Sequence, residues 1–270
     1  MRVHMIETRK FETIDLSVHN YIAELHLNRP QAKNAMNYRM VEELTDVFEG
    51  LKGRRDVRCI VIAGRDGTFC AGGDIKEMAS NPVPPQESGG NLERMLRACN
   101  EAEQVVIAKI EGAALGGGLG LVCVSDIAIA AETANFGMPE VRLGIAPAFI
   151  SPYVLNRIGL TRSRELMLTG RRFKGQEALA YGLIHYCYAA EELDQQTDQL
   201  LEDLKQSAPG AIAAIKGLIF EVYGKAFEDT ARYRAGLLDD LRQGAEAQEG
   251  MMAFIQKRKA DWAMKGSVDD

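Results

Sequence analysis

Apolar residues in the first part of the chain follow two different periods. Two short β-rich runs, residues 14–18 and 21–27, are separated by two polar residues and predict a β-hairpin. From residue 36 to residue 51 the apolar side chains recur at helical spacing, and Gly53 lies just beyond. This spacing predicts an amphipathic helix that ends near Gly53.

Three later runs are apolar without interruption, at residues 59–63, 105–110 and 122–130. A continuous apolar run of this length is typical of a strand that is covered on both faces. Helical patterns lie between and after these runs. Strands that alternate with helices predict an α/β layered fold.

Two regions depart from this alternation. Residues 79–91 hold three prolines and two glycines, which predicts a loop that acts either as a lid or as a plain surface excursion. After residue 190 the chain becomes helical and charged through Trp262. We therefore expect a core over residues 1–190 and a C-terminal helical region over residues 191–270, both within one domain.

Composition places the chain among ordinary globular proteins. Its 270 residues are 46% hydrophobic and 26% charged, which excludes collagen-like, disordered and disulfide-scaffold classes. Lysine and arginine number 32 against 38 acidic residues, which gives a net charge of −6. A nucleic-acid partner is therefore not expected, because phosphate binding normally needs a basic surface.

The five cysteines form no C-x-x-C pair, and the four histidines lack ligand spacing, so we expect neither a disulfide framework nor a metal site. Residues 112–125 form a charge-free stretch that is too short to span a membrane. Charged residues interrupt the N-terminus, which does not resemble a secretory signal. These features predict a cytoplasmic protein with free thiols.

Common nucleotide and hydrolase motifs are absent, since the chain has no G-x-x-x-x-G-K-[ST], H-E-x-x-H or G-x-S-x-G. Two glycine-rich turns instead follow predicted strands, at residues 64–78 and 111–121. Glycine lets the backbone approach a ligand and point its N–H groups inward. Two converging N–H groups would form an oxyanion hole; the alternative is a pair of tight turns.

These motifs, together with others along the chain, resemble the crotonase (enoyl-CoA hydratase/isomerase) superfamily. The resemblance implies an α/β fold of repeated ββα turns with a helical C-terminal region, assembled as a trimer or a dimer of trimers. It also implies an acyl-CoA thioester as the substrate and no separate cofactor. The matching segments are residues 27–37, 69–78, 112–121, 136–145, 168–184 and 249–262.

The family mechanism, carried over by motif position, assigns three catalytic residues. The backbone N–H groups of Gly73 and Gly117 would hold the enolate oxygen, and each aimed donor is typically worth about 3–4 kcal/mol of barrier. Glu140 would exchange a proton with the thioester α-carbon, which works best if an apolar pocket raises its pKa. The alternative is that Glu140 is a solvated loop residue.

The sequence departs from the family at two places. Typical hydratases carry a second glutamate that activates water, and this chain has Gly120 there. Either Glu140 handles both protons, or another group positions the water, or the reaction is not hydration. Residues 146–154 (APAFISPYV) are also atypical, and with Gly120 they resemble the bacterial 3-methylglutaconyl-CoA hydratase branch.

Further binding residues follow from the resemblance or from charge. Arg142 and Arg157 could each pair with a distal substrate carboxylate, although structural ion pairs are the alternative. His185 and the cysteines are expected to pack rather than react. The resemblance assigns five residues to coenzyme A, the last two reaching a neighbouring subunit's ligand, with solvated surface lysines as the alternative: Lys33, Ala71, Lys76, Phe254 and Lys257.

The sequence therefore predicts a lyase that adds or removes water across a 2-enoyl-CoA. A double-bond isomerase or a decarboxylase is the alternative, because both need an enolate and one proton carrier. A non-catalytic acyl-CoA binder or RNA-associated scaffold is an alternative of another class. Net negative charge argues against RNA, while the basic strip at residues 256–265 keeps that possibility open.

Overall fold

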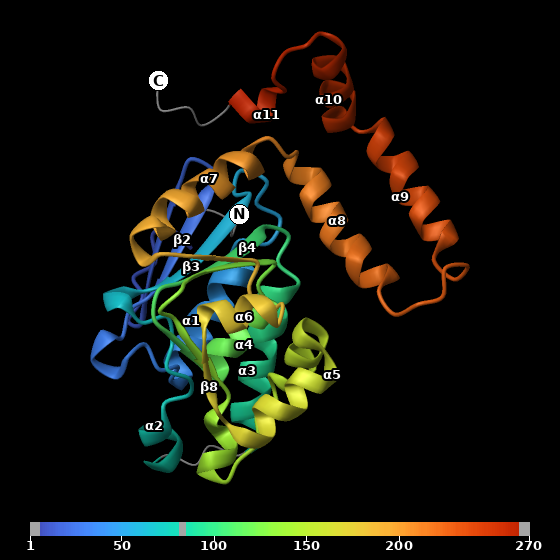
Figure 1. Cartoon of the computed structure of the whole chain (residues 1–270). Coiled ribbons are helices and arrows are strands. Elements are labelled where there is room, and N and C mark those ends of the chain that lie inside the picture. The colour runs from blue at the N-terminus through green and yellow to red at the C-terminus, as the bar shows by residue number, and fades with distance from the viewer. Residues whose placement is uncertain (1–5, 81–84, 265–270) are drawn as a thin grey trace.

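The computed structural model describes residues 6–80 and 85–264, and its centre is a six-stranded sheet (Figure 1). The order is β1-β2-β3-β4-β6-β9, with β1 and β2 antiparallel and the other neighbours parallel. The strands are β1 (Ile14–His19), β2 (Ile22–Leu27), β3 (Cys59–Gly64), β4 (Val105–Ile110), β6 (Ile127–Ala131) and β9 (Tyr186–Tyr188).

A second sheet has three short strands in the order β5-β7-β8. Its members are β5 (Ala113–Leu115), β7 (Asn135–Gly137) and β8 (Arg172–Lys174). β5 follows β4 and leads into a helix, and β7 follows β6 in the same way. These repeated ββα turns confirm the predicted fold class.

Helices cover both faces of the large sheet, and a short helical turn, η3 (Pro139–Leu143), follows β7. The helices are α1 (Tyr38–Gly50), α2 (Ile75–Ser80), α3 (Pro85–Asn100), α4 (Gly117–Val124), α5 (Ser151–Thr169), α6 (Gly175–Ala180), α7 (Leu193–Lys205), α8 (Pro209–Val222), α9 (Ala231–Gln243), α10 (Ala245–Ile255) and α11 (Asp261–Met264).

Strand β3 shows how the core is divided between the two faces. Ile60 and Ile62 join the main core cluster with α1, α3 and α4, whereas Val61 packs in a second cluster with Leu193 and Leu201 of α7. Side chains alternate across a strand, so both faces of β3 need apolar residues. The continuous apolar run at residues 59–63 therefore predicted the strand and its double burial.

The predicted hairpin is confirmed, with Ile14 opposite Leu27. Asn20 and Tyr21 connect the strands with φ values of 44° and 66°, the left-handed conformation that a two-residue hairpin turn requires. The helix predicted over residues 36–51 is α1. The side chain of Asn37 accepts a hydrogen bond from the N–H of Met40 and caps its N-terminus.

Two predictions about local structure were wrong. Residues 122–130 are not one strand, because α4 continues to Val124 and β6 begins only at Ile127. Helix α4 is buried from residue 118 onward and lacks a polar face, so its pattern matches that of a buried strand. The loop predicted over residues 79–91 is helical up to Ser80 and again from Pro85, a position that a helix start tolerates; residues 81–84 lie outside the described residues.

The C-terminal helices α8, α9 and α10 stand away from the sheets, and α11 comes last (Figure 1). Two buried cationic side chains connect this region to the core. The Nζ atom of Lys216 on α8 lies 2.6 Å from a carboxylate oxygen of Asp126, and Arg58 donates to the backbone carbonyls of Lys205 and Trp262. The expected division at residue 190 stays a prediction.

Candidate active site

The two glycine-rich segments lie side by side through backbone hydrogen bonds. The N–H of Cys70 donates to the carbonyl of Ala113 at 2.8 Å, and the N–H of Leu115 donates back to Cys70 at 2.9 Å. On the opposite side, Met36 donates to the carbonyl of Gly72 at 2.8 Å. Segments that follow different strands are thus fixed against each other at one end of the sheet.

Glycine is needed for this close approach. A Cβ atom on Gly118 would lie 2.6 Å from the carbonyl oxygen of Cys70, which is a backbone atom with little freedom to move. Gly72 has a φ of 103°, and a Cβ there would lie 3.1 Å from the carbonyl oxygen of Leu115. The close packing of the two segments therefore requires glycine at these positions. The same packing places both segments at the pocket.

The N–H groups of Gly73 and Gly117 remain available. Within residues 6–80 and 85–264, neither donates to a protein acceptor. Gly117 is the first residue of α4, so its N–H has no partner inside the helix and lies at the helix's positive end. Both glycines line one pocket of about 430 Å³. The arrangement suits an anionic oxygen, while the catalytic roles themselves stay predictions.

Glu140 lines the same pocket from η3. Its Oε1 atom lies 2.9 Å from the position of a Cβ on Gly116, which places the carboxyl beside the second glycine segment. Its Oε2 atom is buried and has no hydrogen-bond partner in the described part of the chain. Burial raises the pKa of this carboxyl. Glu140 is thus half-buried and uncompensated rather than a solvated loop residue.

The apolar side chains around Glu140 come mainly from residues outside its own sequence segment. Phe136 and Met138 are fully buried in the core, and Val141 is exposed. The apolar side chains that line the pocket include Met36, Val41, Ile75, Met78, Leu92, Leu115, Leu143, Ile145, Phe149 and Ile150.

Gly120 and the atypical stretch at residues 146–154 are parts of one packing arrangement. A Cβ on Gly120 would lie only 2.3 Å from the Cγ2 atom of Ile150. Ile150 is 3% exposed and lines the pocket. Its side chain therefore fills the space that a side chain at position 120 would need. The other carboxylate of the pocket lining, Glu77, accepts the N–H of Tyr38 at 2.8 Å. Glu140 is therefore the one uncommitted carboxylate among the lining residues.

The five residues assigned to coenzyme A fall into two groups. Ala71 lines the pocket, and its N–H donates to the carbonyl of Lys33 at 3.1 Å. Lys76 lies on α2 between the lining residues Ile75 and Glu77. Ala71 thus lies at the pocket, and Lys33 and Lys76 lie next to residues that line it.

The other two coenzyme A residues belong to a different part of the molecule. Phe254 lies at the end of α10 and is 85% exposed, and Lys257 follows it. Neither lines the pocket, and α10 lies far from α2, whose residues do line it (Figure 1). Within a single chain, the structure does not bring these two residues to the site.

The two arginines suggested for a substrate carboxylate have different surroundings. Arg142 lines the pocket, whereas Arg157 donates to the carbonyls of Leu183 and Ser125 at 3.0 and 2.9 Å. Arg157 is therefore structural. Arg172 also lines the pocket, and sequence reasoning missed it although it lies in one of the matching segments.

The side chains of His185 and Cys70 contribute to the packing of the protein rather than to the pocket. His185 accepts the N–H of Ala128 through Nδ1 at 3.0 Å. Burial raises the pKa of the Cys70 thiol to about 11, so this cysteine stays protonated near neutral pH. In the described ranges no group of His, Cys, Asp or Glu could hold a metal ion, and no helix has the length and apolar character to cross a membrane.

Comparison with known proteins adds independent evidence. Residues 17–265 match a family described as enoyl-CoA hydratase/isomerase. A probable enoyl-CoA hydratase of Bacillus subtilis is 32% identical over 252 residues, which cover 91% of this chain and 96% of that protein. A carnitinyl-CoA dehydratase of Proteus mirabilis is 31% identical, covering 93% of this chain and 98% of that protein.

Solved structures agree with this sequence similarity. AtuE of Pseudomonas aeruginosa is 44% identical with a TM-score of 0.91, and the match covers 94% of this chain and all of AtuE. An enoyl-CoA hydratase/isomerase from Marinobacter aquaeolei is 39% identical with a TM-score of 0.89, covering 93% of this chain and 99% of that chain.

Proposed function

The chain belongs to the enoyl-CoA hydratase/isomerase family, and from that premise we propose that it adds water reversibly to a 2-enoyl-CoA thioester. One observation supports this proposal most strongly. The uncompensated carboxyl of Glu140 lines the same pocket as the two available N–H groups, those of Gly73 and Gly117. These are the groups needed to move a proton and to hold the oxygen of a thioester enolate.

We further propose that Glu140 handles both proton transfers. Ionised Glu140 takes a proton from water while the water oxygen forms a bond to the β-carbon. The electron pair of the double bond moves to the α-carbon and the thioester oxygen, where the two N–H groups stabilise it. Glu140 then returns the proton to the α-carbon. The packing of Ile150 against Gly120 supports a site with one carboxylate.

For the substrate we propose 3-methylglutaconyl-CoA or a related branched acyl-CoA, on the resemblance of residues 146–154 and Gly120. Coenzyme A would contact Lys33, Ala71 and Lys76, and no separate cofactor is needed. Phe254 and Lys257 would contact the coenzyme A bound by a neighbouring subunit of a trimer or hexamer. We expect the enzyme to act in the cytoplasm.

The test is incubation with 3-methylglutaconyl-CoA, and in parallel with crotonyl-CoA, followed by mass analysis of the products. We expect a product heavier by one water, and a loss of about 10²–10⁴-fold in rate for Glu140→Gln. A variant as active as the wild type would contradict the role of Glu140. Absence of hydration with both substrates, despite binding, would contradict the hydratase proposal.

The lone carboxylate also favours a second candidate, a double-bond isomerase. Isomerisation needs the same enolate and one proton carrier but no activated water. A decarboxylase has the same needs. Deuterium incorporated from heavy water at the α-carbon, without added water, would support these alternatives. Binding of the thioester without any α-exchange would support the non-catalytic acyl-CoA binder.

A further inference from the structure

Two guanidinium groups line the pocket and have no acidic partner among the described residues. Arg142 lies on η3 and Arg172 lies on β8. Neither forms an ion pair with a carboxylate of residues 6–80 or 85–264. Both side chains are exposed at the pocket, so their charges are solvated and remain open to a ligand that enters it.

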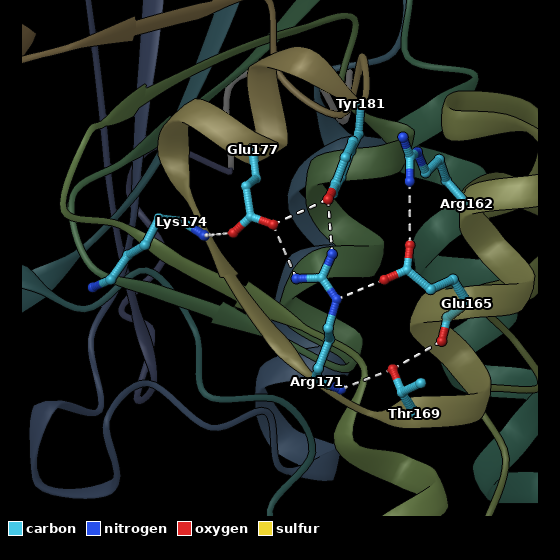
Figure 2. A network of polar contacts seen from close by, with 7 residues as sticks. All are labelled: Arg162, Glu165, Thr169, Arg171, Lys174, Glu177 and Tyr181. Carbon is cyan, nitrogen blue, oxygen red and sulfur yellow. Dashed lines mark hydrogen bonds and ion pairs between the residues drawn. The ribbon is translucent and has the colours of Figure 1, made fainter.

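The adjacent arginine is fully committed elsewhere. Figure 2 shows Arg171 donating to Glu165 at 2.7 Å, to Glu177 at 3.0 Å and to the hydroxyl of Tyr181 at 2.7 Å. This network between α5 and α6 uses both nearby carboxylates. Because successive side chains of an extended segment point to opposite sides, Arg172 faces away from the network and lines the pocket.

A backbone carbonyl positions Arg142, and both guanidinium groups keep donors that no described residue accepts from. Arg142 uses its Nε atom to donate to the carbonyl of Thr169 at 3.3 Å, and its stem packs against Gly170. The Cγ atom of Arg172 lies 3.5 Å from the position of a Cβ on Gly137. The terminal nitrogens of both side chains donate to no protein acceptor in the described residues.

The carboxylates of the pocket do not neutralise these charges. The carboxylate of Glu77 already accepts a hydrogen bond from the N–H of Tyr38. Burial is the main cause of the raised pKa of Glu140, and neither arginine offsets it. A guanidinium within a few ångströms would lower that pKa. The two arginines therefore do not compensate the carboxyl of Glu140, although all three side chains line the same pocket.

We propose that Arg142 and Arg172 form a subsite for a terminal oxyanion of the substrate. The ligand is either a carboxylate at the far end of the acyl group or a phosphate of coenzyme A. A planar guanidinium binds either group through two parallel hydrogen bonds, and it stays charged at all physiological pH values. The inference rests on the proposed function in one respect, that the pocket takes an acyl-CoA thioester.

Calorimetric titration of four proteins tests the subsite. The wild type is compared with Arg142→Gln, with Arg172→Gln and with Arg164→Gln, the last being an exposed arginine on α5 outside the pocket. The ligands are butyryl-CoA, glutaryl-CoA, and the same two thioesters of dephospho-coenzyme A. We expect each pocket variant to lose about tenfold or more in affinity for at least one anionic ligand, and Arg164→Gln to bind all four as the wild type does.

The ligand series distinguishes the two anion sources. A loss confined to the glutaryl thioesters assigns the subsite to the acyl carboxylate. A loss shared by butyryl-CoA and glutaryl-CoA but absent with the dephospho thioesters assigns it to the phosphate on the ribose of coenzyme A. An equal loss with all four ligands assigns it to the diphosphate, which the dephospho thioesters retain. Unchanged affinity in both pocket variants for all ligands would overturn the subsite. Because binding is measured rather than turnover, failure of the hydratase proposal would show separately, as tight binding without product.

Discussion

At the scale of single residues, the proposed chemistry depends on the carboxyl of Glu140. One of its oxygens is buried and accepts no hydrogen bond from the residues that the structure describes, and burial raises its pKa. A carboxyl whose pKa is raised toward neutrality can both accept and donate a proton in one catalytic cycle. In the proposed mechanism, that property lets a site with a single carboxylate complete an addition that needs two proton transfers.

The same burial predicts a pH-dependent effect of Glu140→Gln on stability. A raised pKa in the folded state means that the folded protein favours the neutral carboxyl. This contribution to stability is fully present below the pKa of the unfolded chain and is lost as pH rises through the folded-state pKa. The neutral variant should therefore melt at a higher temperature than the wild type at pH 8, and the difference should vanish near ~pH 4.

Thermal unfolding at the two pH values checks this prediction. Glu191→Gln is the matched control, because Glu191 is exposed on the surface and the same change there removes a solvated charge. A Glu140→Gln variant that is less stable than the wild type at pH 8, or whose difference is the same at both pH values, would contradict the account of an uncompensated carboxyl.

At the scale of elements, the site depends on the contact between the two glycine segments. We expect Gly118→Ala to destabilise the protein by about 1–3 kcal/mol, because the new Cβ would lie 2.6 Å from the carbonyl oxygen of Cys70. Gly236→Ala is the control. Gly236 lies inside α9 with no atom within 4 Å of the new Cβ, so alanine should stabilise by up to ~1 kcal/mol.

Denaturant unfolding of both glycine variants, with activity measured alongside, checks the prediction. Gly118→Ala should also lose activity, because separation of the segments moves the N–H of Gly117. Full stability and full activity in Gly118→Ala would show that the close approach of the two segments does not fix the oxyanion site.

Elements were predictable where one local pattern determined them. β3 and β4 are continuous apolar runs, and α1 has one apolar face, so the sequence identified all three. α4 was missed because it is buried on every side and has no polar face to reveal its period. The helix at Pro85 was missed because proline and glycine usually indicate loops, whereas proline is tolerated in a first helical turn.

The site was predictable to the extent that its residues belong to local motifs. The glycine motifs and the segment around Glu140 pointed to three residues, and the structure brings all three to one pocket. The contact of Ile150 with Gly120 and the position of Arg172 were not predictable. Each depends on how separate segments pack, which no local pattern in a single sequence records.

At the scale of the whole molecule, the C-terminal helices expose large apolar side chains. Phe227 is 71% exposed, Ile255 is 73% exposed, and Leu238 on α9 is 66% exposed. Monomeric proteins rarely display so many large apolar residues on one region. This surface supports the proposed trimer or hexamer, in which a neighbouring chain would also receive Phe254 and Lys257.

Light scattering of the purified protein measures the assembly directly. We expect a mass of three or six times that of the 29.7 kDa chain, unchanged over a wide range of protein concentration. A monomer mass at micromolar concentration would contradict the proposed assembly. It would also leave Phe254 and Lys257 without a route to any coenzyme A.

In the proposed function, the intact enzyme forms a thioester enolate with Glu140 as the proton carrier. The most direct measurement is incubation of butyryl-CoA, which has no double bond to hydrate, with the enzyme in heavy water. We expect deuterium at the α-carbon with the wild type and almost none with Glu140→Gln. No deuterium with the wild type, or equal incorporation by both proteins, would contradict it.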